Sequence, residues 1–259
     1  MKPLILVSND DSYSARGVNS LIEWIKEIGD VVAVCPATPQ SGKSMALTVN
    51  DPLWITEIPY DGAKMYKLTG TPVDCIKVSM HYILDRKPDL VVSGINHGSN
   101  AAVNVFYSGT MGAAIEGALF GIPSVGFSLT DHSPDANFNP CRKAVEMIVK
   151  GMLEHGLPEK TCLNVNIPNL QETPREMRLC ESCQGYWNDE YKEYTDPMGR
   201  KFYMLSGEFV NMEPDNDITD EWALAHGIIS VVPTVVERTG VDTPEIPWLR
   251  QMIKSYRIR

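Results

Sequence analysis

Two adjacent carboxylates follow the first apolar run of the sequence. Residues 4–12 read LILVSNDDS, so Asp10 and Asp11 stand directly after a stretch that suits a buried strand. Neighbouring carboxylates repel each other, and at the end of a buried strand that repulsion is poorly screened. Asn-Asp-Asp-Ser could simply turn the chain and cap the helix that begins near Gly17, but one Asp is enough for that task. A cation held between the two side chains explains the pair better.

The elements around this pair predict where it lies in the fold. The apolar run at 4–7 is followed by an amphipathic helix at 18–28 and by a β-branched strand at 31–35. Strand, helix and strand within about thirty residues form a βαβ unit, which implies parallel strands and a right-handed crossover. The alternation continues to residue 168, with helices predicted at 71–84, 110–121 and 141–156 and strands at 89–93, 124–129 and 162–168. We therefore predict an α/β fold with a doubly wound, mostly parallel sheet.

The last third of the chain departs from this pattern. Residues 170–215 are polar and aromatic, and they indicate a hairpin or arm with little core of its own. A helix capped at Thr219 or Asp220, and a strand that follows Gly227, restore the order. At the end, residues 247–259 place several apolar side chains on one face of a predicted terminal helix. Such a face needs a surface to dock on, either in the same chain or in a partner.

Polar side chains gather in the loops that follow the predicted strands. In open α/β sheets, ligands bind at the carboxyl ends of the strands, where these loops meet. This rim carries Asn9, Asp10, Asp11, Gln40, Ser41, Asn96, Ser108 and Thr110. Hard oxygen donors from separate loops suit Mg²⁺ or Mn²⁺. Taken alone, SGINHGSN at 93–100 is more often a glycine-rich turn, and the helix start at 108–110 is either an anion site or an ordinary N-cap.

Composition restricts the function classes. The chain has 259 residues, 43% of them hydrophobic, which is enough to bury one sizeable core. Its net charge of −10 disfavours binding to nucleic-acid polymers. The first apolar run is too short for a signal peptide, and no run is long enough to span a bilayer, so we expect no association with membranes. Six scattered cysteines are typical of reduced core residues, and we expect a cytoplasmic protein.

Other motifs for phosphate or nucleophile chemistry do not fit. ATPQSGKS at 37–44 ends like a Walker A loop, but Ala37 replaces its first glycine and no helix is predicted after it. No G-x-G-x-x-G follows the first strand, and no G-x-S-x-G supplies a nucleophile. Cys180 and Cys183 form a lone C-x-x-C, which supports zinc only weakly. A water activated by a metal is therefore the simplest reagent.

Several strings taken together resemble the SurE (survival protein E) family of 5′/3′-nucleotidases. They are ILVSNDDS, PQSGKS, LTGTPVDC, LVVSGINHGSN, YSGTMGAAIEGALFGIPSVGFSL and TDEWALAHGIISVVP, in order from residue 4 to about residue 233. The resemblance implies a Rossmann-like three-layer α/β/α sandwich that hydrolyses nucleoside 5′-monophosphates, and 3′-monophosphates as a second class. It also implies homodimers or homotetramers that exchange C-terminal segments. Residues 1–168 would form the phosphatase core, and residues 169–259 would complete this single domain and supply an oligomerisation arm.

The resemblance also implies roles for the rim residues. One divalent metal ion per subunit, Mg²⁺ or Mn²⁺, would be held by Asp10, Asp11, Ser41 and Asn96. Asp10, Asp11 and Asn96 would be the catalytic residues. Phosphate would contact Asn9 and the helix start formed by Ser108, Gly109 and Thr110. The chain departs from the family pattern at Ser12, Arg16, Ser44 and Met45, and these departures concern substrate preference more than chemistry.

Two alternatives to a nucleotidase remain at this point. A broad-specificity, acid-phosphatase-like enzyme or an exopolyphosphatase would use the same ligands on other substrates. A non-catalytic nucleotide or metal sensor would bind phosphate through the same layer of the fold without turning it over. The group that receives the nucleoside is also open, because His97, Phe106 and Tyr107 are only scattered candidates on the rim.

Overall fold

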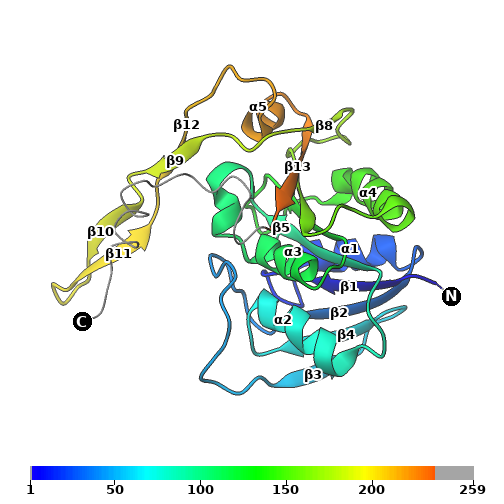
Figure 1. Cartoon of the computed structure of the whole chain (residues 1–259). Coiled ribbons are helices and arrows are strands. Elements are labelled where there is room, and N and C mark those ends of the chain that lie inside the picture. Colours follow the sequence, from blue (N-terminus) through cyan, green and yellow to red (C-terminus); the bar gives the residue numbers. More distant parts are fainter. Residues whose placement is uncertain (1, 237–259) are drawn as a thin grey trace, which may run out of the picture.

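A nine-stranded sheet with helices on both faces forms the body of the protein (Figure 1). The computed structural model describes residues 2–236, and there the strand order of this sheet is β3-β4-β2-β1-β5-β6-β7-β13-β8. The strands span Leu4–Ser8 (β1), Asp30–Pro36 (β2), Ile55–Ile58 (β3), Lys64–Leu68 (β4), Leu90–His97 (β5), Ser124–Leu129 (β6), Thr161–Ile167 (β7), Met177–Leu179 (β8) and Ile229–Val235 (β13). β3 runs antiparallel to β4 and β13 antiparallel to β7, whereas the other neighbours are parallel. The prediction of an α/β fold with a mostly parallel sheet is confirmed.

The helices divide between the two faces of the sheet. They span Arg16–Ile25 (α1), Pro72–Val78 (α2), Gly109–Leu119 (α3), Arg142–His155 (α4) and Asp220–Ala225 (α5). α1 and α4 pack together over the larger apolar cluster, and α2 and α3 pack together on the other face. The periodicity of α1 shows why it binds the sheet, because Val18, Leu21, Ile22 and Ile25 recur at helical spacing and all are fully buried.

The order of the strands reverses next to β1. From β1 the chain moves outward through β2 and β4, and it then returns to the other side of β1 to add β5, β6 and β7. In doubly wound sheets of this kind, ligands bind at the carboxyl ends of the two strands on either side of the reversal. Asp10 and Asp11 follow one of these strands, and Asn96 lies near the end of the other.

A β-bulge interrupts β5 just before this edge. The ladder between β5 and β6 shifts register between Ser93 and Asn96, so β5 carries an additional residue there. A bulge bends its strand and changes the direction of the side chains that follow. Gly17 of α1 packs against the bulge, and a Cβ at this position would lie 2.0 Å from the carbonyl oxygen of Ile95. The glycine therefore allows α1 to approach the backbone that presents Asn96.

Several elements differ from the pattern predicted from the sequence. The helix predicted at 71–84 is divided, because α2 ends at Val78 and a single π-helical turn follows at Ser79–Ile83. The Ser79 hydroxyl donates to the Cys75 carbonyl at 2.6 Å, a bond that competes with regular helical pairing. The strand predicted at 89–93 continues to His97. β3 and β4 have no counterpart in the prediction, since β3 is exposed along most of its length and carries little apolar signal.

An arm built from four short strands leaves the body (Figure 1). The strands span Gly185–Asn188 (β9), Tyr191–Thr195 (β10), Lys201–Leu205 (β11) and Glu208–Asn211 (β12). β9 pairs with β12 and β10 with β11, both antiparallel, which confirms the hairpin predicted within residues 170–215. Every residue of β10 and β11 is exposed. The terminal helix predicted at 247–259 lies outside the described residues.

After the arm the chain returns to the main sheet through α5 and β13. Thr219 is the N-cap of α5, and its hydroxyl accepts a hydrogen bond from the Trp222 N–H at 3.3 Å. Of the two caps that the sequence allowed, the structure therefore uses Thr219. All six cysteines are buried and none forms a disulfide. Within residues 2–236, no helix has the length and apolar character needed to cross a membrane.

Candidate active site

Asp10 lies at the carboxyl end of β1 with its side chain almost fully enclosed. The residue is 3% exposed, and within residues 2–236 no basic side chain forms an ion pair with it. Burial, and to a smaller extent the charge of Asp11, raise the pKa of Asp10 to about 6. The Thr110 hydroxyl donates to Asp10 Oδ1 at 2.5 Å, which favours the carboxylate and opposes part of this rise. Asp10 is thus a buried acidic group whose charge no basic side chain among the described residues neutralises.

Helix α3 begins directly beside Asp10. Ser108 is the N-cap, and its hydroxyl accepts from the Met111 N–H at 3.0 Å. The first turn of a helix carries N–H groups without helical partners and a partial positive charge. Gly109 makes the approach possible, because a Cβ there would lie 2.8 Å from the Asp10 Cβ. The structure therefore brings the predicted phosphate-binding segment and the first carboxylate of the pair together.

Asp11 contacts the end of β5. Its Oδ2 atom accepts a hydrogen bond from the backbone N–H of His97 at 3.2 Å and lies 3.4 Å from His97 Nδ1. The His97 ring packs edge-on against Phe138, with ring centroids 4.9 Å apart. The preceding residue, Asn96, donates its side-chain amide to the Gly98 carbonyl at 2.9 Å, so its amide oxygen is the side-chain atom that could act as a ligand. The second carboxylate and Asn96 are therefore held at the same edge of the sheet.

The loop that follows β2 is attached to the same corner. The Gln40 N–H donates to the backbone carbonyl of Asp10 at 2.7 Å, which places the next residue, Ser41, in the neighbourhood of the acidic pair. Ser41 is exposed, and its hydroxyl makes no hydrogen bond to any described residue. Further along, the Ser44 hydroxyl donates to the Phe106 carbonyl at 2.6 Å. The loop is thus tied both to the end of β1 and to the segment that precedes α3.

Asn9 serves the turn after β1. It is fully buried, and its side-chain nitrogen donates to the Ser12 carbonyl at 2.9 Å. Its side-chain oxygen is buried and has no hydrogen-bond partner among the described residues. Of the predicted phosphate site, the structure therefore places the segment 108–110 beside Asp10. The side-chain nitrogen of Asn9 instead donates to the local backbone.

The donor set fits a divalent cation that prefers oxygen ligands. The predicted ligands are two carboxylates, a hydroxyl and an amide oxygen, from Asp10, Asp11, Ser41 and Asn96. Such hard donors, supplied by separate loops, suit Mg²⁺ or Mn²⁺. Asp10 is buried without a positive partner, and the Asn9 oxygen is buried without a donor. A bound cation, together with the water that it carries, would satisfy both groups.

A buried network of side-chain amides fixes the chain after Asn96. The Asn100 N–H donates to Asn166 Oδ1 at 2.7 Å, and the Asn100 side chain donates to the Ser128 hydroxyl at 2.8 Å. The Asn164 side chain donates in turn to the Asn100 carbonyl at 2.8 Å. These residues are 5% exposed or less, so the paired amides hold the segment rigidly against β6 and β7. Two asparagines inside the apolar run CLNVNIP were the sequence signal for this network.

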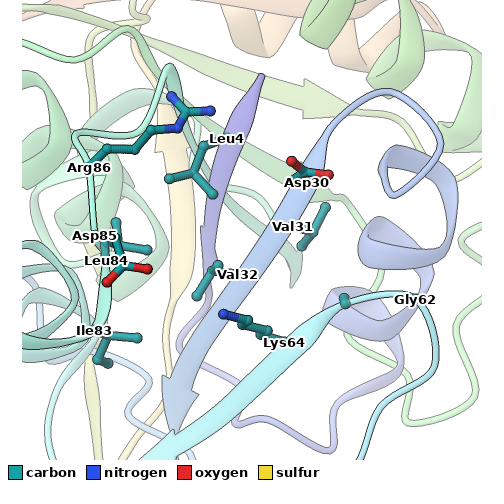
Figure 2. Close-up of a pocket in the computed structure, with 11 residues that line it drawn as sticks. Leu4, Asp30, Val31, Val32, Gly62, Lys64, Ile83, Leu84, Asp85 and Arg86 are labelled. Carbon is teal, nitrogen blue, oxygen red and sulfur yellow. The ribbon is translucent and has the colours of Figure 1, made fainter. Parts of the chain in front are cut away.

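A separate pocket of about 510 Å³ opens at the amino-terminal edge of the sheet (Figure 2). It is lined by apolar side chains and by charges of both signs, namely Leu4, Val31, Val32, Ile83, Leu84, Asp30, Lys64, Asp85 and Arg86. Arg86 is already bound to Asp89 at 2.8 Å and to the Lys2 carbonyl at 3.1 Å. The pocket lies at the edge opposite to Asp10, and it adds nothing to the site described above.

The fold and the candidate site define a doubly wound α/β protein with an acidic, oxygen-rich cluster where the strand order reverses. Within this class the chain belongs to the SurE family, whose sequence model, described as survival protein SurE, matches residues 5–189. The resemblance noted in the sequence is therefore confirmed.

Individual relatives cover nearly the whole chain. A protein from Bacteroides fragilis named 5′-nucleotidase SurE is 50% identical over 240 residues, which is 92% of this chain and 94% of that protein. A protein of the same name from Christiangramia forsetii is 48% identical over 243 residues, or 92% of this chain and 93% of its own. The crystal structure of the SurE protein from Aquifex aeolicus is similar with a TM-score of 0.82 and 34% identity, and the match covers 98% of this chain and 100% of that one.

Proposed function

We propose that this protein hydrolyses nucleoside 5′-monophosphates to nucleoside and phosphate, with 3′-monophosphates as a second substrate class. The observation that carries the proposal is the acidic pair where the strand order reverses. Asp10 is enclosed there without a positive partner, and it is bonded to the start of α3. The relatives named 5′-nucleotidase SurE support the same activity.

One divalent metal ion per subunit, Mg²⁺ or Mn²⁺, belongs to this proposal, held by Asp10, Asp11, Ser41 and Asn96. When bound, such an ion offsets the charge of an anionic ester and lowers the pKa of a coordinated water. The chain contributes by fixing its oxygen ligands. Thr110 orients the carboxylate of Asp10, and the His97 N–H orients that of Asp11. Because the pKa of Asp10 is about 6, this carboxyl is mostly ionised at neutral pH even before a cation binds.

The start of α3 binds the phosphoryl group in this proposal. The hydroxyl and the N–H of Thr110 are both directed at Asp10, and the Met111 N–H is bonded to the Ser108 hydroxyl. Among the described residues, the Gly109 N–H is therefore the first-turn donor left for a phosphate oxygen, and Gly109 has no side chain to cover it. The partial positive charge of a helix N-terminus favours an anion locally, which matters in a protein with a net charge of −10.

The nucleoside is received by exposed aromatic side chains beside the phosphate site. Phe106 and Tyr107 immediately precede the N-cap of α3 and are 71% and 56% exposed. The His97 ring is less available, because it packs against Phe138. Stacking on an aromatic ring discriminates weakly among bases, since every base offers a π-face. We therefore expect purine and pyrimidine monophosphates to be hydrolysed with kcat/KM values within roughly a hundredfold of each other.

A substrate panel tests the proposal. Release of inorganic phosphate would be measured on 5′- and 3′-monophosphates, ATP, polyphosphate and an aryl phosphate, each with Mg²⁺, Mn²⁺ or EDTA. We expect turnover of monophosphates that depends on the metal, and slower turnover of ATP, because its extra charge meets an acidic surface. Activity that survives EDTA, or a preference for ATP over every monophosphate, contradicts the proposal.

The same panel separates the alternative functions. Faster hydrolysis of the aryl phosphate or of polyphosphate than of any nucleotide would establish a broad-specificity phosphatase or an exopolyphosphatase. Binding of a nucleotide without turnover in either metal would establish a sensor. The exposed aromatic residues favour the nucleotidase over the polyphosphatase, because a polyphosphate chain has no ring to stack on them.

We further propose that residues 1–168 and 169–259 form a single domain of a cytoplasmic homodimer or homotetramer with exchanged C-terminal segments. β8 and β13 support the single domain, since both belong to the main sheet. The arm supports the oligomer through the large side chains exposed on β10 and β11, namely Tyr191, Tyr194, Phe202, Tyr203, Met204 and Leu205. The register of the two strands places Tyr191, Tyr203 and Leu205 on one face of this ribbon and Tyr194, Phe202 and Met204 on the other. Exposed apolar side chains of this kind are typical of an interface.

A further inference from the structure

The loop at 98–107, which includes a short 3-10 helix at Ala102–Phe106, joins the two halves of the proposed site, and a distant carboxylate holds its middle. The loop begins after His97, the last residue of the strand that carries Asn96, and it ends at Ser108, the N-cap of α3. At its centre the Ala102 N–H donates to Asp220 Oδ2 at 2.8 Å. Asp220 is the first residue of α5 and is 0% exposed. A residue of the C-terminal region therefore reaches the segment that carries the start of α3.

The Asp220 carboxylate connects three segments of the chain. Its other oxygen, Oδ1, accepts from the Cys183 N–H at 2.9 Å and from the Glu221 N–H at 2.8 Å. Capping of α5 does not require it, because Thr219 already caps that helix. Burial raises the pKa of Asp220, so an ionised carboxylate is costly at this position. A role limited to the structure of α5 therefore does not explain why an acidic side chain is buried at position 220.

The conformation of Ala102 shows what the carboxylate contributes. Ala102 has a φ of 51°, in the left-handed region that few residues other than glycine adopt. Such a conformation persists where the surroundings hold it in place. The hydrogen bond from Ala102 to Asp220 lies at this residue, and it is shielded from water. Loss of the bond should therefore allow the loop to relax.

Contacts on either side of Ala102 determine where such a relaxation spreads. Toward Asn96, the amide network holds Asn100 against β6 and β7, so a movement of Ala102 should not be transmitted to the end of β5. Toward α3, the anchors come from surface segments. The Asn104 side chain accepts from Trp187 Nε1 of the arm at 2.8 Å, and the carbonyl of Phe106 accepts from the Ser44 hydroxyl. Movement at Ala102 should reach the phosphate end of the site and leave Asn96 in place.

We propose that Asp220 is a positioning residue that sets the phosphate-binding end of the site by holding the loop at 98–107. Through it, and through the bond from Trp187 to Asn104, the base of the arm controls how well phosphate binds. This inference rests on the proposed function for the identity of the ligand. The hydrogen bonds that carry it are independent of that function.

The test compares Asp220→Asn with the wild-type protein. An amide at this position can give its oxygen to Cys183 and Glu221 and must then present its NH₂ group to the Ala102 N–H, which breaks that bond alone. The matched control is Asp217→Asn, because Asp217 is exposed and its side chain makes no hydrogen bond within residues 2–236. Three quantities would be measured: Mn²⁺ affinity, the affinity of the Mn²⁺-loaded protein for orthophosphate, and amide hydrogen exchange.

We expect orthophosphate affinity to fall roughly tenfold in Asp220→Asn, the effect of losing one charged hydrogen bond. Mn²⁺ affinity should stay within about twofold, and exchange should accelerate at 98–107 and not in β5. With nucleotide, KM should rise by a larger factor than kcat falls. Unchanged phosphate affinity and exchange would overturn the proposal. Equal losses of Mn²⁺ and phosphate affinity, with faster exchange throughout, would also overturn it, because they indicate general destabilisation.

Trp187→Phe keeps the proposal testable if Asp220→Asn does not fold. Phenylalanine removes the indole N–H that Asn104 accepts, but it retains a ring to pack against Phe209. We expect the same pattern with a smaller change, roughly threefold in phosphate affinity. Wild-type affinity and exchange in this variant would contradict the role of the arm. Hydrogen exchange decides the role of the loop even if the wild-type protein hydrolyses no nucleotide, so the two proposals fail separately.

Discussion

Replacing Asp10 by Asn should stabilise the metal-free protein while removing most of its activity. Asp10 is 3% exposed, and burial together with Asp11 raises its pKa to about 6, against 3.8 for an ordinary aspartate. At pH 8 this difference corresponds to about 3 kcal/mol by which the charged carboxylate disfavours the folded state. Asn carries no charge, and its oxygen still accepts the hydrogen bond from Thr110. The substitution should therefore recover most of that free energy.

The pH dependence of this effect has a definite sign. Because the pKa of Asp10 is higher in the folded state, the folded protein binds more protons than the unfolded chain between about pH 4 and pH 6. Wild-type stability should fall as the pH rises through this interval and level off above it. In urea unfolding with EDTA, Asp10→Asn should be more stable by about 2–3 kcal/mol at pH 8 and by about half as much at pH 5. The exposed Asp135 gives the control, because Asp135→Asn should show neither change.

Addition of Mn²⁺ should reverse the order of the two proteins. A ligand that binds only the folded state raises its stability by mass action, and the variant lacks one of the proposed ligands. The wild type should gain stability with Mn²⁺ concentration, whereas Asp10→Asn should gain little and lose at least roughly a hundredfold in kcat. A stability difference that is the same at pH 5 and pH 8 would refute the electrostatic reasoning. Near wild-type turnover of the variant in saturating Mn²⁺ would remove Asp10 from the site.

Two further substitutions and one truncation test other parts of the chain. Gly109→Ala places a Cβ 2.8 Å from the Asp10 Cβ, so kcat/KM should fall roughly tenfold or more while the circular dichroism spectrum stays unchanged. Wild-type kinetics in this variant would show that the close approach of α3 to Asp10 is not required. Ser44→Ala removes the hydrogen bond to the Phe106 carbonyl, and KM should rise roughly threefold with little change in melting temperature. An unchanged KM would show that this hydrogen bond does not contribute to substrate binding. Deletion of 246–259 should lower the oligomeric mass measured by light scattering, whereas a full mass would indicate docking within one chain.

How well the sequence predicts each element depends on the burial of that element. β5 is buried from Leu90 through Ile95, so its apolar run is visible without any alignment. β3 is exposed at Ile55, Thr56 and Glu57, and it exists because β4 pairs with it. An edge strand of this kind owes its conformation to the partner strand more than to its own side chains. The sequence of β3 alone therefore carries no recognisable signal.

The site residues divide in the same way. Asp10, Asp11 and Asn96 stand at strand ends, so the order of the elements is enough to place them on one edge of the sheet. Asp220 is different, because its partner Ala102 is 118 positions away and the link exists only in the folded chain. In the sequence, Asp220 is already accounted for as a residue at the start of a helix. The structure gives that task to Thr219 and leaves the carboxylate for the loop.

The departures of this chain from the family pattern can be understood from the backbone. Ser12 and Ser44, two of the positions where the sequence departs from that pattern, have φ values of 88° and 52°. A residue other than glycine costs of order 1 kcal/mol or more in this region, so each serine carries backbone strain. The Ser44 hydroxyl offsets part of that cost through its bond to the Phe106 carbonyl, which glycine cannot make. Each serine therefore holds a strained turn close in sequence to a proposed ligand, with Ser12 next to Asp11 and Ser44 three residues after Ser41. Ser44 also attaches its loop to the segment that carries the exposed aromatic residues. Substitutions at Ser44 should accordingly change nucleoside preference more than the dependence on metal.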